Sequence, residues 1–183
     1  MATGQWLTPA DDARFFFDSG ALSLDFAHSS AQDAQELHDW LADRFESLSP
    51  DTTDRDQVDA GGLRAAILRL ARASADTAAP DPDDIDTVNL FAATPDVPPS
   101  LDGGRRQAGR TRVRTGQALA TIARDAVTLF EQNTDGRIRE CAADDCHLIF
   151  FDESRTNNRR WCSMQRCGNR AKIRAFRAKG TGE

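Results

Sequence analysis

Four cysteines are the residues of this chain whose type and spacing most clearly indicate chemistry. They lie within the last 43 of 183 residues, with four residues inside each pair and fifteen between the pairs: Cys141 and Cys146, then Cys162 and Cys167. A short turn between paired cysteines lets two thiolates reach one ion, and a spacer of hairpin length returns the second pair to it. The pattern therefore predicts one structural Zn²⁺ per chain. A site closed by four thiolates leaves no position for a catalytic water.

The cysteines have two other interpretations, namely two disulfides or four unrelated buried thiols. The N-terminal residues contain neither the basic segment nor the apolar stretch of a secretory signal. We therefore expect the chain to stay in the cytoplasm, where disulfides are rare. All cysteines of the chain fall into this one cluster, which favours a metal over scattered thiols.

The residues around the cysteine pairs predict a small finger. Residues 147–151 have the pattern of a strand, 152–158 that of a polar turn, and 159–161 that of a return strand ending at Cys162. Cys167 is expected in the first turn of a final helix. A knuckle, a hairpin and a helix that carries the last ligand make up a treble-clef-like finger. Because so short a segment cannot build a core of its own, the metal would hold its fold.

Charge is divided unevenly along the chain. The formal net charge is −6, but residues 1–133 contain 12 basic and 22 acidic residues, whereas residues 134–183 contain 11 basic and 7 acidic ones. Residues 154–180 include nine Lys and Arg and no acid. Since local potential decides where phosphates bind, this asymmetry predicts a polyanion-binding tail on an acidic carrier. The other interpretation is a terminal helix whose arginines are only solvated.

Seven basic residues of the tail are the candidate DNA contacts: Arg155, Arg159, Arg160, Arg170, Lys172, Arg174 and Arg177. Helical spacing places Arg170, Arg174 and Arg177 on one face of the final helix. Ile173 and Phe176 form a neighbouring apolar stripe, which we expect to pack on the hairpin. Phosphate contacts carry no sequence information, so the pattern predicts affinity for DNA and names no operator.

Two residues beside the cysteines have a structural interpretation as well as a functional one. Arg170 could bond the thiolates or nearby carbonyls instead of DNA. Trp161 precedes a metal ligand, so it is either a core residue of the finger or a platform on which bases stack. The sequence leaves both alternatives open.

Residues 1–133 are predicted to form an acidic, mainly helical domain. Alternating Leu22, Leu24 and Phe26 indicate a short strand within residues 14–29. Helices are expected from Asp33 toward residue 48, over 55–77, from Asp81 to about 91, and over 117–132, with a loop at 94–110. Together with a basic zinc-finger domain at 134–183, this predicts an α+β fold that is mainly α with small β elements.

The N-terminal region offers few side chains for catalysis. Asp25 and His28 are three residues apart, which in a strand places them on opposite faces, so we interpret them as a satisfied polar pair at a strand end. An enzyme pocket around Asp25, His28 and Trp40 is the weakest hypothesis, because no nucleophile motif, phosphate loop or second metal cluster accompanies them. The sequence therefore predicts no enzyme. It also lacks the run of about 18 apolar residues that would span a membrane.

The tail resembles the CGNR zinc finger family, which is named for the tetrad found here at residues 167–170. The similarity extends over about residues 137–179 and includes both cysteine pairs, the DESR run at 152–155, the RWCS run at 160–163, Lys172 and Arg177. More weakly, GALSLDF at 20–26 and LHDWL at 37–41 are similar to the ABATE domain that usually precedes this finger. That family often has Asn-Thr after this element, where the present chain has His28 and Ser29.

The resemblance implies a stress-linked bacterial transcription regulator with a DNA-binding finger. DNA is the expected partner, and the candidates for the N-terminal domain are a small-molecule effector and self-association. The alternative function is a zinc-stabilised protein-interaction or RNA-binding module without sequence-specific DNA recognition, which presents Trp161 and the arginines to an acidic partner or to single strands.

Overall fold

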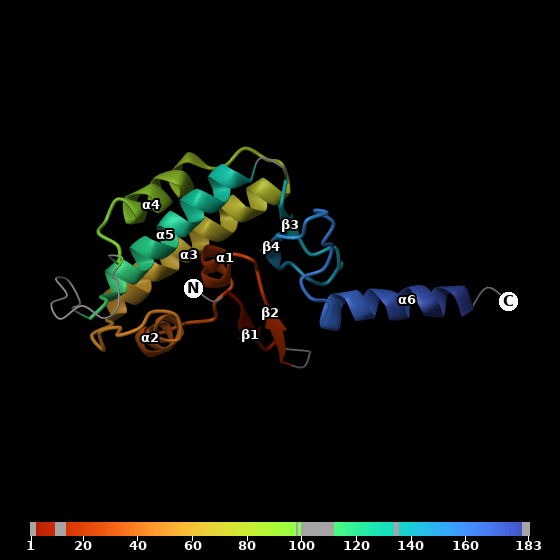
Figure 1. The fold of residues 1–183 in the computed structure, drawn as a ribbon, viewed down its shortest axis with the longest axis horizontal. Coiled ribbons are helices and arrows are strands. Elements are labelled where there is room, and N and C mark those ends of the chain that lie inside the picture. The colour runs from red at the N-terminus through yellow and green to blue at the C-terminus, as the bar shows by residue number, and fades with distance from the viewer. Residues whose placement is uncertain (1–2, 10–13, 98, 100–111, 134–135, 181–183) are drawn as a thin grey trace.

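Helices α3 (Asp54–Ala75), α4 (Pro82–Ala92) and α5 (Thr115–Gln132) form the centre of a helical body in the computed structural model (Figure 1). The short helices α1 (Leu22–Ala27) and α2 (Ala34–Ala42) pack beside them. The structure describes residues 3–9, 14–97, 99, 112–133 and 136–180, with side chains up to 177. Most buried apolar side chains of the body come from these helices, including Leu37, Leu41, Leu63, Ile67, Leu119 and Ile122.

The helices of the body begin where capping side chains predict. Asp33 accepts a hydrogen bond from the backbone N–H of Glu36, and Asp81 accepts one from Asp83 with Pro82 in the first turn. Thr53 and Asp56 form a reciprocal capping box before α3. The predicted starts and the predicted helices over 55–77 and 117–132 are thus confirmed to within a turn. Helix α2 ends at Ala42, before the predicted limit.

The predicted strand at Leu22, Leu24 and Phe26 is wrong, because these residues belong to α1. Every residue of α1 is buried, including Ser23 and Asp25, so the helix shows no polar face and its pattern imitates alternation. The strand of this region is β2 (Phe15–Phe17), which pairs antiparallel with β1 (Gln5–Leu7). Most of the predicted loop at 94–110 lies outside the described residues.

The finger contains a second antiparallel hairpin, β3 (Ile138–Glu140) with β4 (Ile149–Phe151), then the π-helical turn η1 (Met164–Gly168) and α6 (Asn169–Gly180). The predicted return strand at 159–161 is wrong: these residues are irregular, and the partner of β4 precedes the first cysteine pair. A backbone hydrogen bond from the Ala142 N–H to the Arg160 carbonyl links that segment to the knuckle. Cys167 lies in η1, directly before the final helix.

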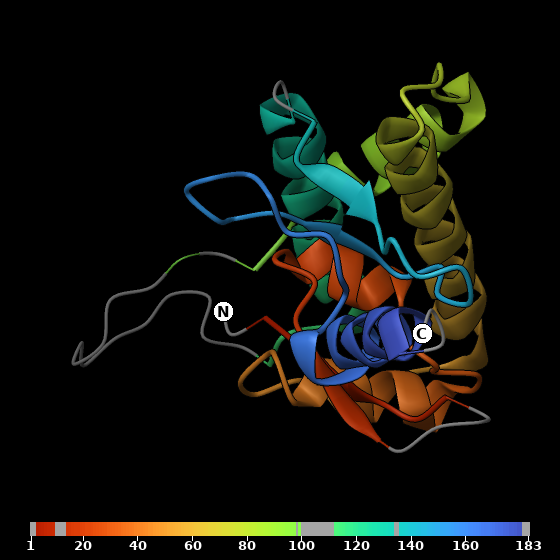
Figure 2. The ribbon, with the colours of Figure 1, turned by 90° about the vertical axis from the view of Figure 1, so that its right-hand side faces the viewer.

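Helix α6 extends away from the rest of the molecule, as two views at right angles show (Figures 1 and 2). Our expectation that its apolar stripe packs on the hairpin is wrong. Ile173 is 51% exposed and Phe176 is 80% exposed. The helix continues directly from η1, and Arg170 and Arg174 in its first two turns pair with Asp144 and Asp145 of the knuckle.

The body and the finger share a hydrophobic core. Ala21, Leu24, Ala71 and Leu129 of the body form one buried cluster with Ile138 and Ile149 of the finger. A boundary at residue 133 therefore remains a prediction about sequence organisation, because side chains pack across it. No helix in the described ranges combines the length and the apolar character needed to cross a bilayer.

Candidate metal centre and basic surface

The four cysteine sulfurs converge on one point in the finger. Their Sγ atoms all lie within 4.8 Å of one another, and all four residues are buried and free of disulfides. The Sγ atoms of Cys146 and Cys162 are 3.6 Å apart, and those of Cys162 and Cys167 are 3.5 Å apart. Four sulfurs around Zn²⁺ at about 2.3 Å would be about 3.8 Å apart. The cluster therefore fits one tetrahedral zinc ion, which would tie the knuckle, the irregular segment and η1 together.

Positive groups surround the sulfurs. Arg170 Nη2 donates to Cys167 Sγ at 3.2 Å, Arg166 Nη1 approaches Cys146 Sγ at 3.8 Å, and the backbone N–H of Cys162 donates to Cys141 Sγ at 3.3 Å. Four thiolates around Zn²⁺ carry a net charge of −2, so two guanidinium groups balance the site. The bond to Cys167 raises the pKa of Arg170.

The thiols also interact with one another. Hydrogen bonds from Cys146 and Cys162 lower the pKa of Cys141, whereas the same pairing raises the pKa of Cys162. One sulfur is thus readily deprotonated. Zinc binding requires all four thiols to lose their protons.

The N-terminal hairpin forms one wall of the metal centre. Phe15 and Phe17 of β2 pack in the same buried cluster as the four cysteines and Phe150. The guanidinium of Arg166 lies 4.8 Å from the centre of the Phe15 ring. Residues from the two ends of the chain therefore exclude water from the sulfurs together.

Backbone contacts fix the finger to the body. The N–H of Phe151 donates to the Ser19 carbonyl at 2.7 Å. Gly20 has φ of +80°, and a Cβ there would lie 2.6 Å from the Phe151 carbonyl oxygen. Only glycine tolerates both this conformation and this approach. The Gly20 position of the ABATE-like element thus serves the junction.

His28 and Asp25 are both satisfied, but they do not pair with each other as we had interpreted them. His28 Nε2 lies 3.1 Å from the backbone N and O of Ile149, and burial lowers its pKa to about 4. Asp25 accepts hydrogen bonds from Ser19 and Gly4, and burial raises its pKa. Both side chains therefore hold structure, His28 across the junction and Asp25 at the N-terminal hairpin.

Asp152 shapes the loop that precedes the third cysteine. Its buried carboxylate accepts hydrogen bonds from the N–H groups of Ser154 and Arg159 at 2.9 and 2.7 Å. Burial raises the pKa of Asp152, but the hydrogen bonds outweigh burial and the net shift is downward. The charged form of this carboxylate therefore stabilises the loop.

The predicted DNA contacts occupy two kinds of position. Arg159 stacks over Phe150 and donates to the carbonyls of Asp18, Trp161 and Cys162, so its guanidinium is used within the fold. Arg170 bonds Cys167 and Asp145, which favours its structural interpretation.

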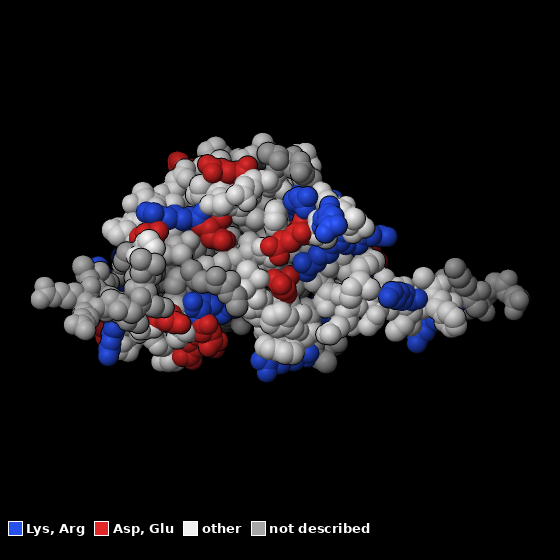
Figure 3. All heavy atoms as spheres, in the orientation of Figure 1, with Lys and Arg blue, Asp and Glu red and all other residues white. Residues whose placement is uncertain are grey.

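The other predicted contacts lie at the surface. Arg174 pairs with Asp144 and Asp145 at 3.7 Å but is 58% exposed. Arg155, Arg160, Lys172 and Arg177 are exposed, with the guanidinium of Arg160 5.2 Å from the Trp161 ring centre. Figure 3 shows basic side chains on the finger and on α6, whereas most acidic ones of this face lie over the body.

Sequence reasoning missed Arg166, the acidic pair Asp144–Asp145, and the two phenylalanines of β2. Arg166 precedes a cysteine ligand, and the acidic pair sits between Cys141 and Cys146, so both could have been found from their positions. Phe15 and Phe17 gave no such signal, because more than a hundred residues separate them from the cysteines.

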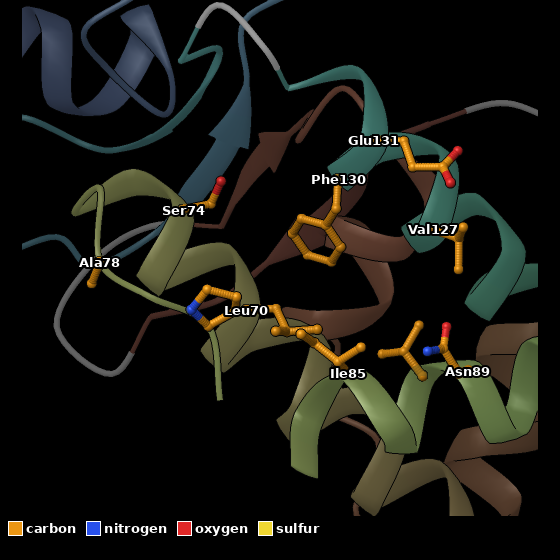
Figure 4. Close-up of a pocket in the computed structure, with 10 residues that line it drawn as sticks. Leu70, Ser74, Ala78, Ile85, Asn89, Val127, Phe130 and Glu131 are labelled. Atoms are coloured by element: carbon orange, nitrogen blue, oxygen red, sulfur yellow. The ribbon is translucent and has the colours of Figure 1, made fainter. Parts of the chain in front are cut away.

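The body contains an apolar groove far in sequence from the metal. It has a volume of about 420 Å³ and lies between α3, α4 and α5, where Leu70, Ile85, Val127 and Phe130 line it (Figure 4). Ser74, at one end of the groove, accepts a hydrogen bond from Asn133, whose Oδ1 accepts from the N–H groups of 137 and 138. The groove wall is thereby bonded to the start of β3.

Comparison with protein families gives two matches. Residues 20–133 match the ABATE model, described as "Putative stress-induced transcription regulator". Residues 137–180 match the model of the CGNR zinc finger. A search of curated proteins finds no match.

Proposed function

The chain belongs to the ABATE family and carries a CGNR zinc finger after the ABATE region, and on this premise we propose that it is a DNA-binding transcription regulator. One observation carries the proposal: a four-cysteine centre stiffens a finger whose exposed surface is basic, on a body that is acidic. When bound, zinc supplies a rigid cross-link and no open position for catalysis. Both families are regulatory or zinc-finger families, so we propose no enzymatic activity. Such a regulator would act in the cytoplasm.

The proposed contacts are the exposed cations Arg155, Arg160, Lys172, Arg174 and Arg177. Arg159 and Arg170 hold the loop and the metal centre in shape, so they act through the others. Arginine and lysine side chains neutralise phosphates and release counterions, which makes binding fall steeply with salt.

The body is proposed to bind a small-molecule effector rather than DNA. Its groove is lined mainly by apolar side chains, with Asn89 and Glu131 as polar groups, and it suits a small apolar effector. A bound effector would alter the position of β3 through Phe130 and the Ser74–Asn133 hydrogen bond. Ser74→Ala should leave DNA affinity intact and weaken any effect of a groove ligand on it.

The test of DNA binding compares two variants that remove the same charge. Arg155→Ala with Lys172→Ala should weaken binding to duplex DNA and reduce the slope of log affinity against log salt by about 2. The matched control is Arg55→Ala with Arg112→Ala, which removes two exposed arginines of the body. Equal behaviour of the two double variants would refute the proposed surface.

A second candidate function is binding of single-stranded RNA. A shallow depression of about 730 Å³ places Phe16, Trp161 and Met164 beside Arg160, and the rings of Phe16 and Trp161 suit the stacking of unpaired bases. Trp161→Ala should then weaken binding to single strands more than to duplex DNA. Stronger binding of duplex DNA than of single-stranded RNA at the same salt would decide for the first candidate.

A further inference from the structure

Helix α6 presents an apolar stripe that the fold leaves uncovered. Ile173 and Phe176 are neighbours at i and i+3 and are 51% and 80% exposed. The side of the helix that carries Arg170 and Arg174 faces Asp144 and Asp145 of the knuckle. The stripe lies on a different side of the helix, and half or more of each of its two side chains is exposed. An exposed phenylalanine beside an exposed isoleucine indicates a binding surface.

The charges around the stripe decide what can cover it. Helical geometry places Lys172 on one side of the stripe and Arg177 on the other, and α6 contains no acidic residue. A second copy of α6 would bring like charges together, which costs free energy. An apolar stripe between cations instead matches a polyanion that carries apolar groups between its charges.

We infer that α6 enters the major groove of B-form DNA and sets Ile173 and Phe176 against thymine methyl groups. This inference rests on the proposed function and names the chemistry by which the finger reads DNA. The C5 methyl of thymine is the apolar group of the major groove, and it lies between the two phosphate backbones that the flanking cations contact.

The shape of α6 agrees with this placement. Twelve residues make a helix about 18 Å long, and a major groove about 12 Å wide admits one helix. Because α6 extends away from the body, its free end can enter a groove without a clash between the helical body and the duplex (Figures 1 and 2). Double-stranded RNA is excluded, because its major groove is deep and narrow.

The experiment uses the full zinc-loaded chain and two duplexes of about 20 base pairs. One is alternating dA–dT and the other alternating dA–dU, so they differ only in the thymine methyl groups. Fluorescence anisotropy should show tighter binding to dA–dT, by about fourfold for each methyl that is buried. Phe176→Ala should bind dA–dT more weakly and lose most of the preference. Leu90→Ala, at an exposed leucine of α4, should keep it.

Each other outcome overturns the inference in a recognisable way. Equal, salt-dependent binding of both duplexes by the wild type would leave DNA binding standing and remove the methyl contact. Absence of binding to either duplex would remove the proposed function as well. If Phe176→Ala keeps the preference but turns a dimer into a monomer in sedimentation, the stripe is a self-association surface. Zinc content and circular dichroism confirm that the variant is folded.

Discussion

The helical body and the finger are held together by different forces, although they share part of one core. In the body, leucine, isoleucine and alanine side chains of five helices supply the buried surface. In the finger, the buried centre consists of four cysteines and Phe150, completed by Phe15 and Phe17 from the other end of the chain. Apolar burial thus stabilises the body, whereas the finger depends on a metal and on the body against which it packs.

The difference also separates two tasks. The body is acidic and contains a groove lined by three helices, while the finger exposes cations and an apolar stripe on its last helix. The rigid scaffold is therefore distinct from the surface proposed to read DNA. Substitutions at the metal centre, at the junction between body and finger, and at the stripe should lower the stability of the protein by decreasing amounts.

The largest effect is expected from Cys146→Ser. Removal of one thiolate should abolish zinc binding and unfold the finger, since structural zinc contributes on the order of 10 kcal/mol to such segments. Most helical signal in far-ultraviolet circular dichroism should remain, because α3, α4 and α5 belong to the body. Elemental analysis should find about one zinc per wild-type chain and none in the variant. A variant that retains zinc and the wild-type melting curve would contradict this division of forces.

The junction is the next most sensitive place. Gly20→Ala puts a methyl group 2.6 Å from the Phe151 carbonyl at a φ of +80°, and we expect a loss of about 2 to 3 kcal/mol in the free energy of unfolding. Urea titration measures it. Gly62→Ala is the matched control, because Gly62 lies inside α3 with nothing within 4 Å of an added Cβ. That substitution should stabilise by up to about 1 kcal/mol.

Acidification should loosen the junction through His28. Burial, with a smaller contribution from Arg72, lowers the pKa of His28 to about 4 from an ordinary value of 6.5. Between pH 6.5 and pH 4, His28 binds a proton in the unfolded chain but not in the folded chain. The free energy of unfolding therefore falls as the pH drops through this range. At pH 5 the loss is about 1 to 2 kcal/mol. The free energy of unfolding of His28→Gln should lack this part of the pH dependence; parallel curves for both proteins would contradict it.

The smallest effect on stability is expected at the stripe. Ile173→Ala removes a side chain that is 51% exposed, so the free energy of unfolding should change by less than about 0.5 kcal/mol. A loss of more than about 2 kcal/mol in thermal or urea unfolding would mean that α6 folds back on the protein and that the stripe is part of a core.

Local signals in the sequence predicted most of the body. Capping residues such as Asp81 and regular apolar spacing mark helix starts and faces, because both act within one or two turns of chain. The cysteine spacing predicted the metal centre for the same reason. Local patterns gave a wrong prediction for α1, because burial on all sides removed the helical periodicity of its apolar residues. They also failed for β4, because its partner strand precedes the first cysteine pair instead of following the turn at 152–158.

Long-range packing could not be predicted from the sequence. Nothing in the residues around Phe15 indicates that it covers cysteines at the far end of the chain, and nothing around Ile173 indicates an uncovered helix. Amphipathic spacing names the apolar side of a helix but not what lies against it. The prediction that α6 has an apolar stripe was therefore correct, whereas the prediction that the stripe packs on the hairpin was wrong.

The central claim is that a zinc-held finger presents a basic surface to DNA, and the salt dependence of duplex binding with and without zinc tests it most directly. With one zinc per chain, five phosphate contacts predict a slope of log affinity against log salt of about −4 to −5, and chelation should abolish binding. Binding that is independent of salt, or that survives removal of the metal unchanged, would contradict the claim.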